Sequence, residues 1–174
     1  QLDELPQAVA SLAGASGRMQ RIDSAQGGFI VDYAHTPDAL TQVLASLRAH
    51  CVGKLWAVVG CGGDRDAGKR PLMTQAALDV ADAVILTADN PRSEDPLAIL
   101  ADMQAGLSDA QRARVYVEPD RRAAIAYAVT AAGQDDLVVI AGKGHETYQE
   151  INGVRHDFDD RVVVAQALAA AGKA

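Results

Sequence analysis

The sequence predicts an α/β fold in which helices flank a mostly parallel sheet. Short apolar runs rich in β-branched residues alternate with longer segments whose apolar residues recur every three or four positions. Continuous apolar runs are typical of strands buried on both faces, and their alternation with helices indicates right-handed crossovers between parallel strands. Near the C-terminus, the Asn152-Gly153 pair is a strong hairpin signal. The predicted fold class is therefore Rossmann-like, with a C-terminal β-hairpin.

Five apolar runs are predicted to form the strands of the sheet, at residues 29–31, 55–59, 83–87, 115–117 and 137–140. Helices are predicted between them, at residues 37–50, 69–80, 95–107 and 119–132. In the first helix Leu40, Leu44 and Leu47 lie on one face. Prolines lie at or near three helix starts, where a missing N–H costs little: Pro37, Pro96 and Pro119.

The two ends of the chain depart from this alternation. Residues 1–16 are predicted to form a helix and a linker from a preceding region, which leaves residues 17–174 as one domain. The hairpin is predicted over residues 147–157, and a last helix over residues 159–171. Because the chain begins with Gln1 rather than Met, we expect it to be a piece of a longer protein.

The composition is that of an ordinary globular domain and argues against several functions. A net charge of -7 at pH 7 disfavours a general nucleic-acid surface, which would be basic. Aromatic residues make up 4% of the chain, too few for a platform on which single strands stack. No apolar run approaches the roughly 20 residues of a membrane helix. The two cysteines form no disulfide framework. We expect a cytoplasmic protein that binds neither nucleic acid nor membrane.

Polar, loop-forming residues follow four of the predicted strands, at residues 32–38, 60–71, 89–92 and 142–146. The carboxyl ends of parallel strands lie at one edge of a sheet, where ligands bind in folds of this class. The four loops are therefore expected to converge on a common site.

The third loop, Asp89-Asn90-Pro91-Arg92, carries a carboxylate, an amide and a guanidinium within four residues. An arginine fork pairs with a carboxylate, and a carboxylate can receive an ammonium group, so this loop could hold a zwitterion such as an amino acid. The alternative is a surface turn, because Asn-Pro is common turn chemistry.

The second loop is rich in glycine and carries the charges of Arg65, Lys69 and Arg70. A helix that begins near Lys69 adds a partial positive charge that suits an anion. The loop matches neither the Walker A pattern nor the G-x-G-x-x-G fingerprint, so the main grip on any phosphate is expected elsewhere. A glycine-rich connector with solvated charges is the alternative.

The first and last loops supply further candidates. Asp32 ends a strand where an acidic residue often accepts from ribose hydroxyls, although it or Thr36 could instead cap the next helix. His35 and His145 could contact a phosphate, and Glu146 could accept an ammonium group. No metal-ligand spacing of the Cys/His kind and no Ser-His-Asp order is present.

Together these stretches resemble the carboxy-terminal domain of the Mur ligases, which build the peptide of bacterial peptidoglycan by ATP-driven amide formation. The resemblance covers the chain from about residue 17 to its end, and several long motifs in the right order make it specific. The matching segments are Asp-Tyr-Ala-His-Thr-Pro-Asp-Ala at 32–39, Gly-Cys-Gly-Gly-Asp-Arg-Asp at 60–66, Gly-Lys-Arg-Pro-Leu-Met at 68–73, Asp-Asn-Pro-Arg at 89–92 and Gly-Lys-Gly-His-Glu-Thr-Tyr-Gln at 142–149.

The resemblance implies a three-domain enzyme, of which this chain is the third domain. The first domain would hold the UDP-sugar, and the second would carry the phosphate loop and most ligands of ATP and Mg²⁺. The third would bring the incoming amino acid. The arginine that ends the tetrapeptide is a feature of the family members that add meso-diaminopimelate to UDP-MurNAc-L-Ala-D-Glu, and in this respect the chain resembles those members. The implied mechanism is phosphorylation of the D-glutamyl carboxylate by ATP, attack by the amine, and loss of phosphate.

The resemblance also implies site residues. Those that would contact meso-diaminopimelate are Arg65, Asp89, Asn90, Pro91, Arg92, Gly142 and Glu146, and those that would contact the nucleotide are Arg18, Asp32 and His35. Arg92 and Arg65 would take the extra carboxylate that lysine lacks, and Asp89 and Glu146 the distal ammonium. Because the chain has no phosphate loop, we expect it to be inactive alone. The alternatives are a non-catalytic nucleotide or amino-acid binding module, and a Mur ligase that adds another amino acid such as L-lysine.

Overall fold

The structure is a computed structural model that describes residues 19–174. The predicted helix and linker of residues 1–16 lie outside these described residues, and so does Arg18, a predicted nucleotide contact.

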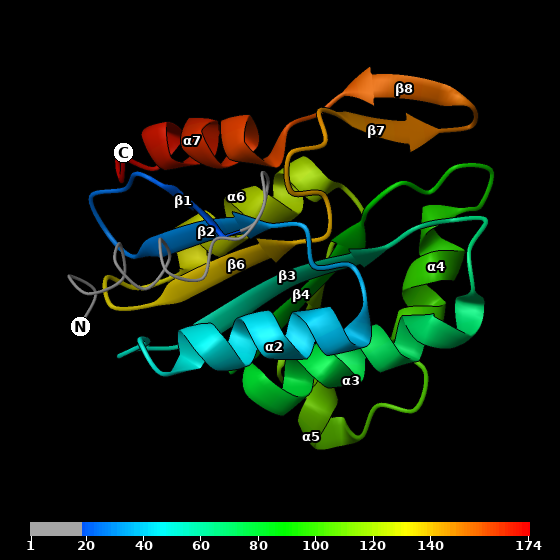
Figure 1. Cartoon of the computed structure of the whole chain (residues 1–174), viewed down its shortest axis with the longest axis horizontal. Coiled ribbons are helices and arrows are strands. Elements are labelled where there is room, and N and C mark those ends of the chain that lie inside the picture. Colours follow the sequence, from blue (N-terminus) through cyan, green and yellow to red (C-terminus); the bar gives the residue numbers. More distant parts are fainter. Residues whose placement is uncertain (1–18) are drawn as a thin grey trace.

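A six-stranded sheet forms the centre of the molecule, with the strand order β1-β2-β6-β3-β4-β5 (Figure 1). The five predicted strands are confirmed as β2 (Gly28–Asp32), β3 (Leu55–Cys61), β4 (Ala83–Ala88), β5 (Val115–Val117) and β6 (Leu137–Ala141). These five run parallel. The sheet also contains β1 (Gln20–Ile22), which was not predicted and pairs antiparallel with β2 at the edge. Three residues, two of them polar, give too little pattern to indicate a strand.

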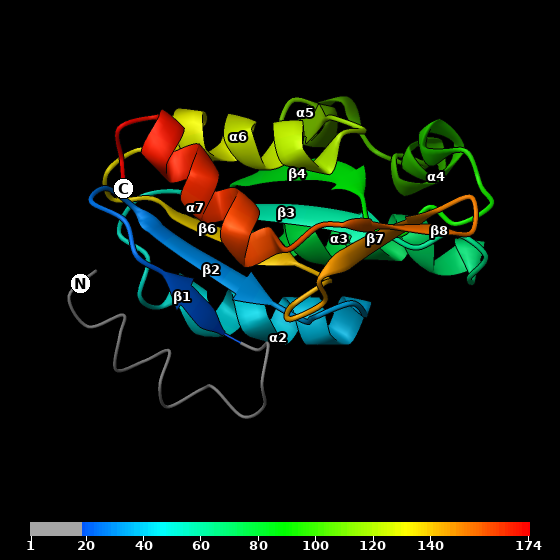
Figure 2. The same cartoon turned by 90° about the horizontal axis from the view of Figure 1, so that it is seen from above.

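Helices cover both faces of the sheet (Figure 2). One face packs against α2 (Pro37–Arg48), α3 (Arg70–Val80) and α4 (Pro96–Met103), and the other against α6 (Arg121–Ala131) and α7 (Asp160–Ala170). The chain moves from β2 through β3 and β4 to β5, and then returns to place β6 between β2 and β3. Because crossovers between parallel strands are nearly always right-handed, this reversal of direction accounts for α6 lying on the opposite face from α2 and α3.

The helix starts follow the local sequence. Side chains of Thr36, Asp95, Asp120 and Asp159 accept a hydrogen bond from a backbone N–H of the first turn of α2, α4, α6 and α7. The helices predicted over residues 37–50 and 95–107 end at Arg48 and Met103, earlier than expected, and a 3₁₀ turn over residues 67–69 precedes α3. A four-residue helix, α5 (Asp109–Arg112), was missed although Ser108 and Gln111 form a capping box that signals it.

The predicted C-terminal hairpin is confirmed as β7 (Tyr148–Ile151) and β8 (Val154–Asp157). Asn152 and Gly153 both have positive φ, 51° and 76°, as a type I′ turn requires. The hairpin is a separate two-stranded sheet that lies beyond the carboxyl ends of the central strands (Figure 1). Its first strand forms a bridge between Ile151 and Arg92, so the hairpin is fixed to the tetrapeptide loop.

Within residues 19–174, no helix combines the length and the apolar character needed to cross a lipid bilayer.

Candidate functional site

The four loops that follow β2, β3, β4 and β6 converge, as the sequence predicts. They line one cavity of about 550 Å³, a size typical of small-molecule sites. Six of the predicted amino-acid contacts line it: Arg65, Asp89, Asn90, Arg92, Gly142 and Glu146. Pro91, the seventh, is buried and does not line it, and its carbonyl lies so close to Gly63 that any Cβ on that glycine would overlap it.

The hairpin holds the tetrapeptide loop by backbone hydrogen bonds. Arg92 N donates to the carbonyl of Glu150 at 3.0 Å, and Asn152 N donates to the carbonyl of Arg92 at 2.8 Å. The side chain of Gln149 donates to the Asp89 carbonyl at 2.8 Å. This pairing fixes Arg92 with a φ of 53°, which is uncommon for a residue other than glycine. Strained backbone of this kind clusters at functional sites.

The guanidinium of Arg92 lies against the glycine-rich loop after β3. Its Nη1 donates to the carbonyl of Gly63 at 2.9 Å, and it occupies the space that a side chain on Gly62 would need. The exposed Arg65 lines the same cavity, and its one hydrogen bond among the described residues is to the carbonyl of Asp64. No carboxylate of the described residues lies within salt-bridge distance of Arg65 or Arg92. Both guanidinium groups can therefore receive an anion.

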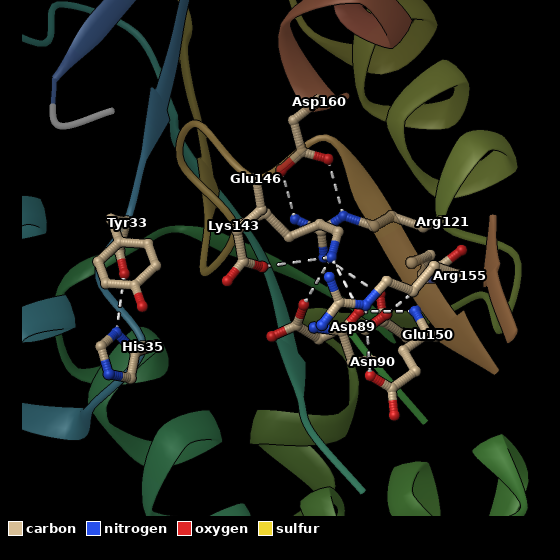
Figure 3. A network of polar contacts seen from close by, with 12 residues as sticks. Tyr33, His35, Asp89, Asn90, Arg121, Lys143, Glu146, Glu150, Arg155 and Asp160 are labelled. Carbon is tan, nitrogen blue, oxygen red and sulfur yellow. Dashed lines mark hydrogen bonds and ion pairs between the residues drawn. The ribbon is translucent and has the colours of Figure 1, made fainter. Parts of the chain in front are cut away.

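A buried cation, Lys143, lies among the side chains of Asp89, Asn90 and Glu146 (Figure 3). Its side chain is 0% exposed, and Nζ lies 3.3 Å from Asp89 Oδ1, 3.1 Å from Asn90 Oδ1 and 3.5 Å from Glu146 Oε1. It also lies 5.7 Å from the centre of the Tyr148 ring. Sequence reasoning assigned no role to this lysine, although its place between two glycines after a buried strand was a signal.

Lys143 partly neutralises the two acidic side chains that were predicted to receive a ligand ammonium. Asp89 and Glu146 already have a cationic partner, so neither is an isolated negative charge. Their side chains remain 14% and 24% exposed, which leaves oxygen lone pairs open to the cavity. Their role toward a ligand stays a prediction.

A second buried ion pair holds the ends of two strands that lead into the site loops. Arg121 and Asp160 join through two hydrogen bonds, of 2.8 and 2.6 Å, and both side chains are completely buried (Figure 3). Burial lowers the pKa of Arg121, but the charge and hydrogen bonds of Asp160, together with the charges of Asp89 and Glu146, raise that pKa above its ordinary value. The guanidinium also donates to the carbonyls of Ala88 and Ala141, the last residues of β4 and β6. Arg121 therefore fixes the strand ends that carry two of the site loops.

The charges of the glycine-rich loop have different roles. Arg70 was expected to add positive charge for an anion, but its side chain is only 3% exposed and is neutralised by Glu94 and Asp102. The hydrogen bonds that Arg70 donates to the Glu94 carboxylate raise the pKa of Arg70 and lower the pKa of Glu94. Arg65 and Lys69 remain exposed at the cavity.

The glycine-rich loop is also fastened to the loop after β4. The Asp64 carboxylate accepts from the hydroxyl of Ser93 at 2.6 Å and from its backbone N–H at 3.2 Å. In return, Asp64 N donates to the Glu94 carboxylate at 2.6 Å. The bonds from Ser93 lower the pKa of Asp64 below its ordinary value. These bonds fix the spacing between the loops that carry Arg65 and Arg92.

A smaller cavity of about 250 Å³ lies beside the first, between the β2–α2 loop and helix α2. Tyr33 and His35 line both cavities. Asp32 lines only the smaller one, and its carboxylate accepts from the backbone N–H groups of Met19 and Ala34 at 2.8 and 2.7 Å. Thr36, not Asp32, caps α2. His35 is exposed, with Nδ1 3.0 Å from the carbonyl of Tyr33. Contacts of Asp32 and His35 with a nucleotide stay predictions.

The described residues offer little for nucleophilic or metal chemistry. Burial raises the pKa of Cys61, at the cavity wall, to about 12, and the nearby Asp89 adds to the shift, so the thiol stays protonated. In residues 19–174 no group of three or more His, Cys, Asp or Glu side chains is placed to hold a metal ion.

Comparison with known proteins agrees with this arrangement. A family model described as "Mur ligase, glutamate ligase domain" matches residues 17–144. The chain belongs to the Mur ligase family. A UDP-N-acetylmuramoyl-L-alanyl-D-glutamate–2,6-diaminopimelate ligase of Xanthomonas campestris pv. campestris is 52% identical over 173 residues, which covers 96% of the chain and 34% of that protein. The enzyme of the same name from Oceanobacillus iheyensis is 49% identical, with 99% of the chain and 35% of that protein covered.

A solved structure of an enzyme with the same name is also similar to this chain. A structure of a UDP-N-acetylmuramoyl-L-alanyl-D-glutamate–2,6-diaminopimelate ligase aligns with a TM-score of 0.85 and 58% identity, over 97% of this chain and 34% of that one. The chain thus spans about a third of the length of the relatives that it matches.

Proposed function

We propose that this chain is the amino-acid-binding and nucleotide-contacting domain of an ATP-dependent ligase that adds meso-diaminopimelate to UDP-MurNAc-L-Ala-D-Glu in peptidoglycan precursor synthesis. The observation that carries the proposal is the convergence of Arg65, Arg92, Asp89, Asn90 and Glu146 on one cavity. The proposal is also supported by relatives about 50% identical over nearly the whole chain that carry this enzyme's name.

The cavity matches the chemistry of diaminopimelate, which is an amino acid at both ends. Two guanidinium groups without carboxylate partners can pair with carboxylates, and a planar guanidinium does so with two parallel hydrogen bonds. Carboxylate oxygens of Asp89 and Glu146 that reach the cavity can accept from an ammonium group. L-lysine has the same ammonium groups but one carboxylate fewer, so it would leave a guanidinium unpaired. Sites built for a polar group can reject such analogues by a factor of roughly 10⁴–10⁵.

The nucleotide would lie toward the smaller cavity. ATP with Mg²⁺, when bound, supplies the phosphoryl group that activates the D-glutamyl carboxylate for attack by the amine. Asp32, His35 and Arg18 are this domain's proposed contacts, with Tyr33 and His35 in the wall that the two cavities share. The described residues offer no metal cluster and the chain has no phosphate loop, so the triphosphate and Mg²⁺ would be held mainly by another domain.

The proposal includes the boundaries and the place of the domain. Residues 17–174 would form the domain, and residues 1–16 would connect it to the preceding one. The whole ligase would act in the cytoplasm, where its nucleotide-linked substrate is made. Its partners would be meso-diaminopimelate and the UDP-MurNAc dipeptide, the latter bound by the other domains.

Phosphate release tests this proposal. The full-length ligase that contains this domain should release phosphate only when ATP, meso-diaminopimelate and the UDP-MurNAc dipeptide are all present. The 174-residue chain under the same conditions should release none. Equal turnover with L-lysine in place of diaminopimelate would contradict the proposed substrate, and turnover by the 174-residue chain would contradict its role as a domain.

A further inference from the structure

The buried ammonium of Lys143 joins two loops that are more than 50 residues apart in the sequence. One loop supplies Asp89 and Asn90, and the other supplies Lys143 and Glu146. Two carboxylates that approach one another in a partly buried place repel, and a cation between them removes that repulsion. The position of Lys143 therefore explains how Asp89 and Glu146 can lie together at the wall of the cavity.

The same ammonium determines which way the Asn90 amide points. Asn90 Oδ1 accepts from Lys143 Nζ at 3.1 Å and from Glu150 N at 2.9 Å. Both partners are pure donors, so the atom that faces them must be the oxygen. The amide NH₂ is then on the other side. It donates to no other group in residues 19–174, and Asn90 lines the cavity.

We propose that Lys143 is a positioning residue that orients the Asn90 amide so that its NH₂, at the cavity that Arg92 also lines, donates to a carboxylate of the amino-acid substrate. This inference rests on the proposed function, because it assumes that the cavity receives an amino acid. With Lys143 present, a rotated Asn90 would turn its NH₂ toward an ammonium and a backbone N–H, leaving donors opposed to donors. Without Lys143, Asn90 loses one of the two bonds that fix it, and its carbonyl can face the substrate carboxylate, which it repels.

Steady-state kinetics of the full-length ligase test the proposal with two substitutions. Lys143→Met keeps the length of the buried chain and removes the ammonium. Asn90→Asp keeps the acceptor for Lys143 and replaces the NH₂ donor by an oxygen. Each should raise the KM for meso-diaminopimelate by roughly 10- to 100-fold, as expected for the loss of a hydrogen bond to a charged group. The KM for ATP should stay within about twofold, because those contacts lie elsewhere.

The double variant and a control complete the experiment. Because both substitutions remove the same donor, the double variant should have a KM for diaminopimelate close to that of the worse single variant. Lys54→Met changes an exposed lysine that precedes β3, at the opposite end of the sheet, and should leave both KM values unchanged.

The outcomes separate this inference from the proposed function. If the wild-type ligase uses diaminopimelate and Lys143→Met or Asn90→Asp leaves its KM unchanged, the inference is wrong and the proposed function stands. An equal rise in the KM for ATP would likewise overturn it, because that result indicates general damage to the fold. If the wild-type enzyme uses L-lysine equally well, the proposed substrate fails and the inference fails with it. Should Lys143→Met not fold, Asn90→Asp alone decides, since it keeps the partner of the buried ammonium.

Discussion

Arg121 and Asp160 form a fully buried, bidentate ion pair that connects helices α6 and α7 (Figure 3). The same guanidinium binds the carbonyls that end β4 and β6. The pair therefore does more than join two helices. It fixes the strand ends from which the loops with Asp89 and Lys143 begin.

Removing Arg121 should destabilise the domain strongly. Arg121→Met leaves Asp160 buried without a partner, and we expect the free energy of unfolding to fall by about 3–5 kcal/mol. Replacing both members, with Arg121→Met and Asp160→Leu, should recover part of this loss, because no uncompensated charge remains. Urea denaturation measures both, and the exposed neighbour Arg122→Met should cost about 1 kcal/mol or less. A single variant as stable as the wild type would show that the pair does not support the strand ends.

Gly63 is required by the close approach of two site loops. A Cβ at this position would overlap the carbonyl of Pro91, so Gly63→Ala must push the loops apart. We expect a loss of about 1–3 kcal/mol in the free energy of unfolding, typical of overpacking. Gly133→Ala is the matched control, since its Cβ would meet only ordinary contacts. Equal thermal unfolding of the two variants would contradict the close contact between the loops.

The bond between Ser93 and Asp64 predicts a change in acid titration. The Ser93 hydroxyl is the main cause of the lowered pKa of Asp64, so Ser93→Ala should raise that pKa toward its ordinary value. NMR titration of the carboxyl measures the change. A carboxyl whose pKa is lowered by folding stabilises the native state above its unfolded pKa, of about 4. This contribution is lost as the pH falls through the lower, folded value.

The stability difference between wild type and Ser93→Ala should therefore be present at neutral pH and shrink in acid. Ser46→Ala, on helix α2, is the control and should leave the Asp64 titration unchanged. A stability difference that grows as the pH falls would have the wrong sign for this account.

Cys61 should be inert although it lines the cavity. With its pKa raised to about 12, the thiol is almost entirely protonated at pH 8. We expect iodoacetamide to leave Cys61 unmodified at pH 8 in the folded chain and to react with it after denaturation, as mass spectrometry of peptides would show. Modification at the same rate in both states would mean that the thiol is not shielded.

Most of the fold could be predicted from the sequence, because continuous apolar runs indicate buried parallel strands and apolar residues spaced three or four apart indicate amphipathic helices. It also predicted that four loops converge on one cavity, because topology places the loops after parallel strands at one edge. It could not assign the roles of charged residues that pair with partners distant in the chain. Arg70, for example, was predicted to offer its charge to an anion, but in the structure it pairs with Glu94 and Asp102. Only the three-dimensional packing buries Lys143 and Arg121 and sets each beside its carboxylate partner.

The most direct test of the account is the preference of the full-length ligase for meso-diaminopimelate over L-lysine, measured as the ratio of their kcat/KM values. Arg92→Ala should lower this ratio by about 100-fold or more, because the guanidinium would select the carboxylate that lysine lacks. Arg155→Ala removes an exposed arginine from the hairpin and should leave the ratio unchanged. An unchanged ratio in Arg92→Ala would contradict the claim that this cavity recognises diaminopimelate.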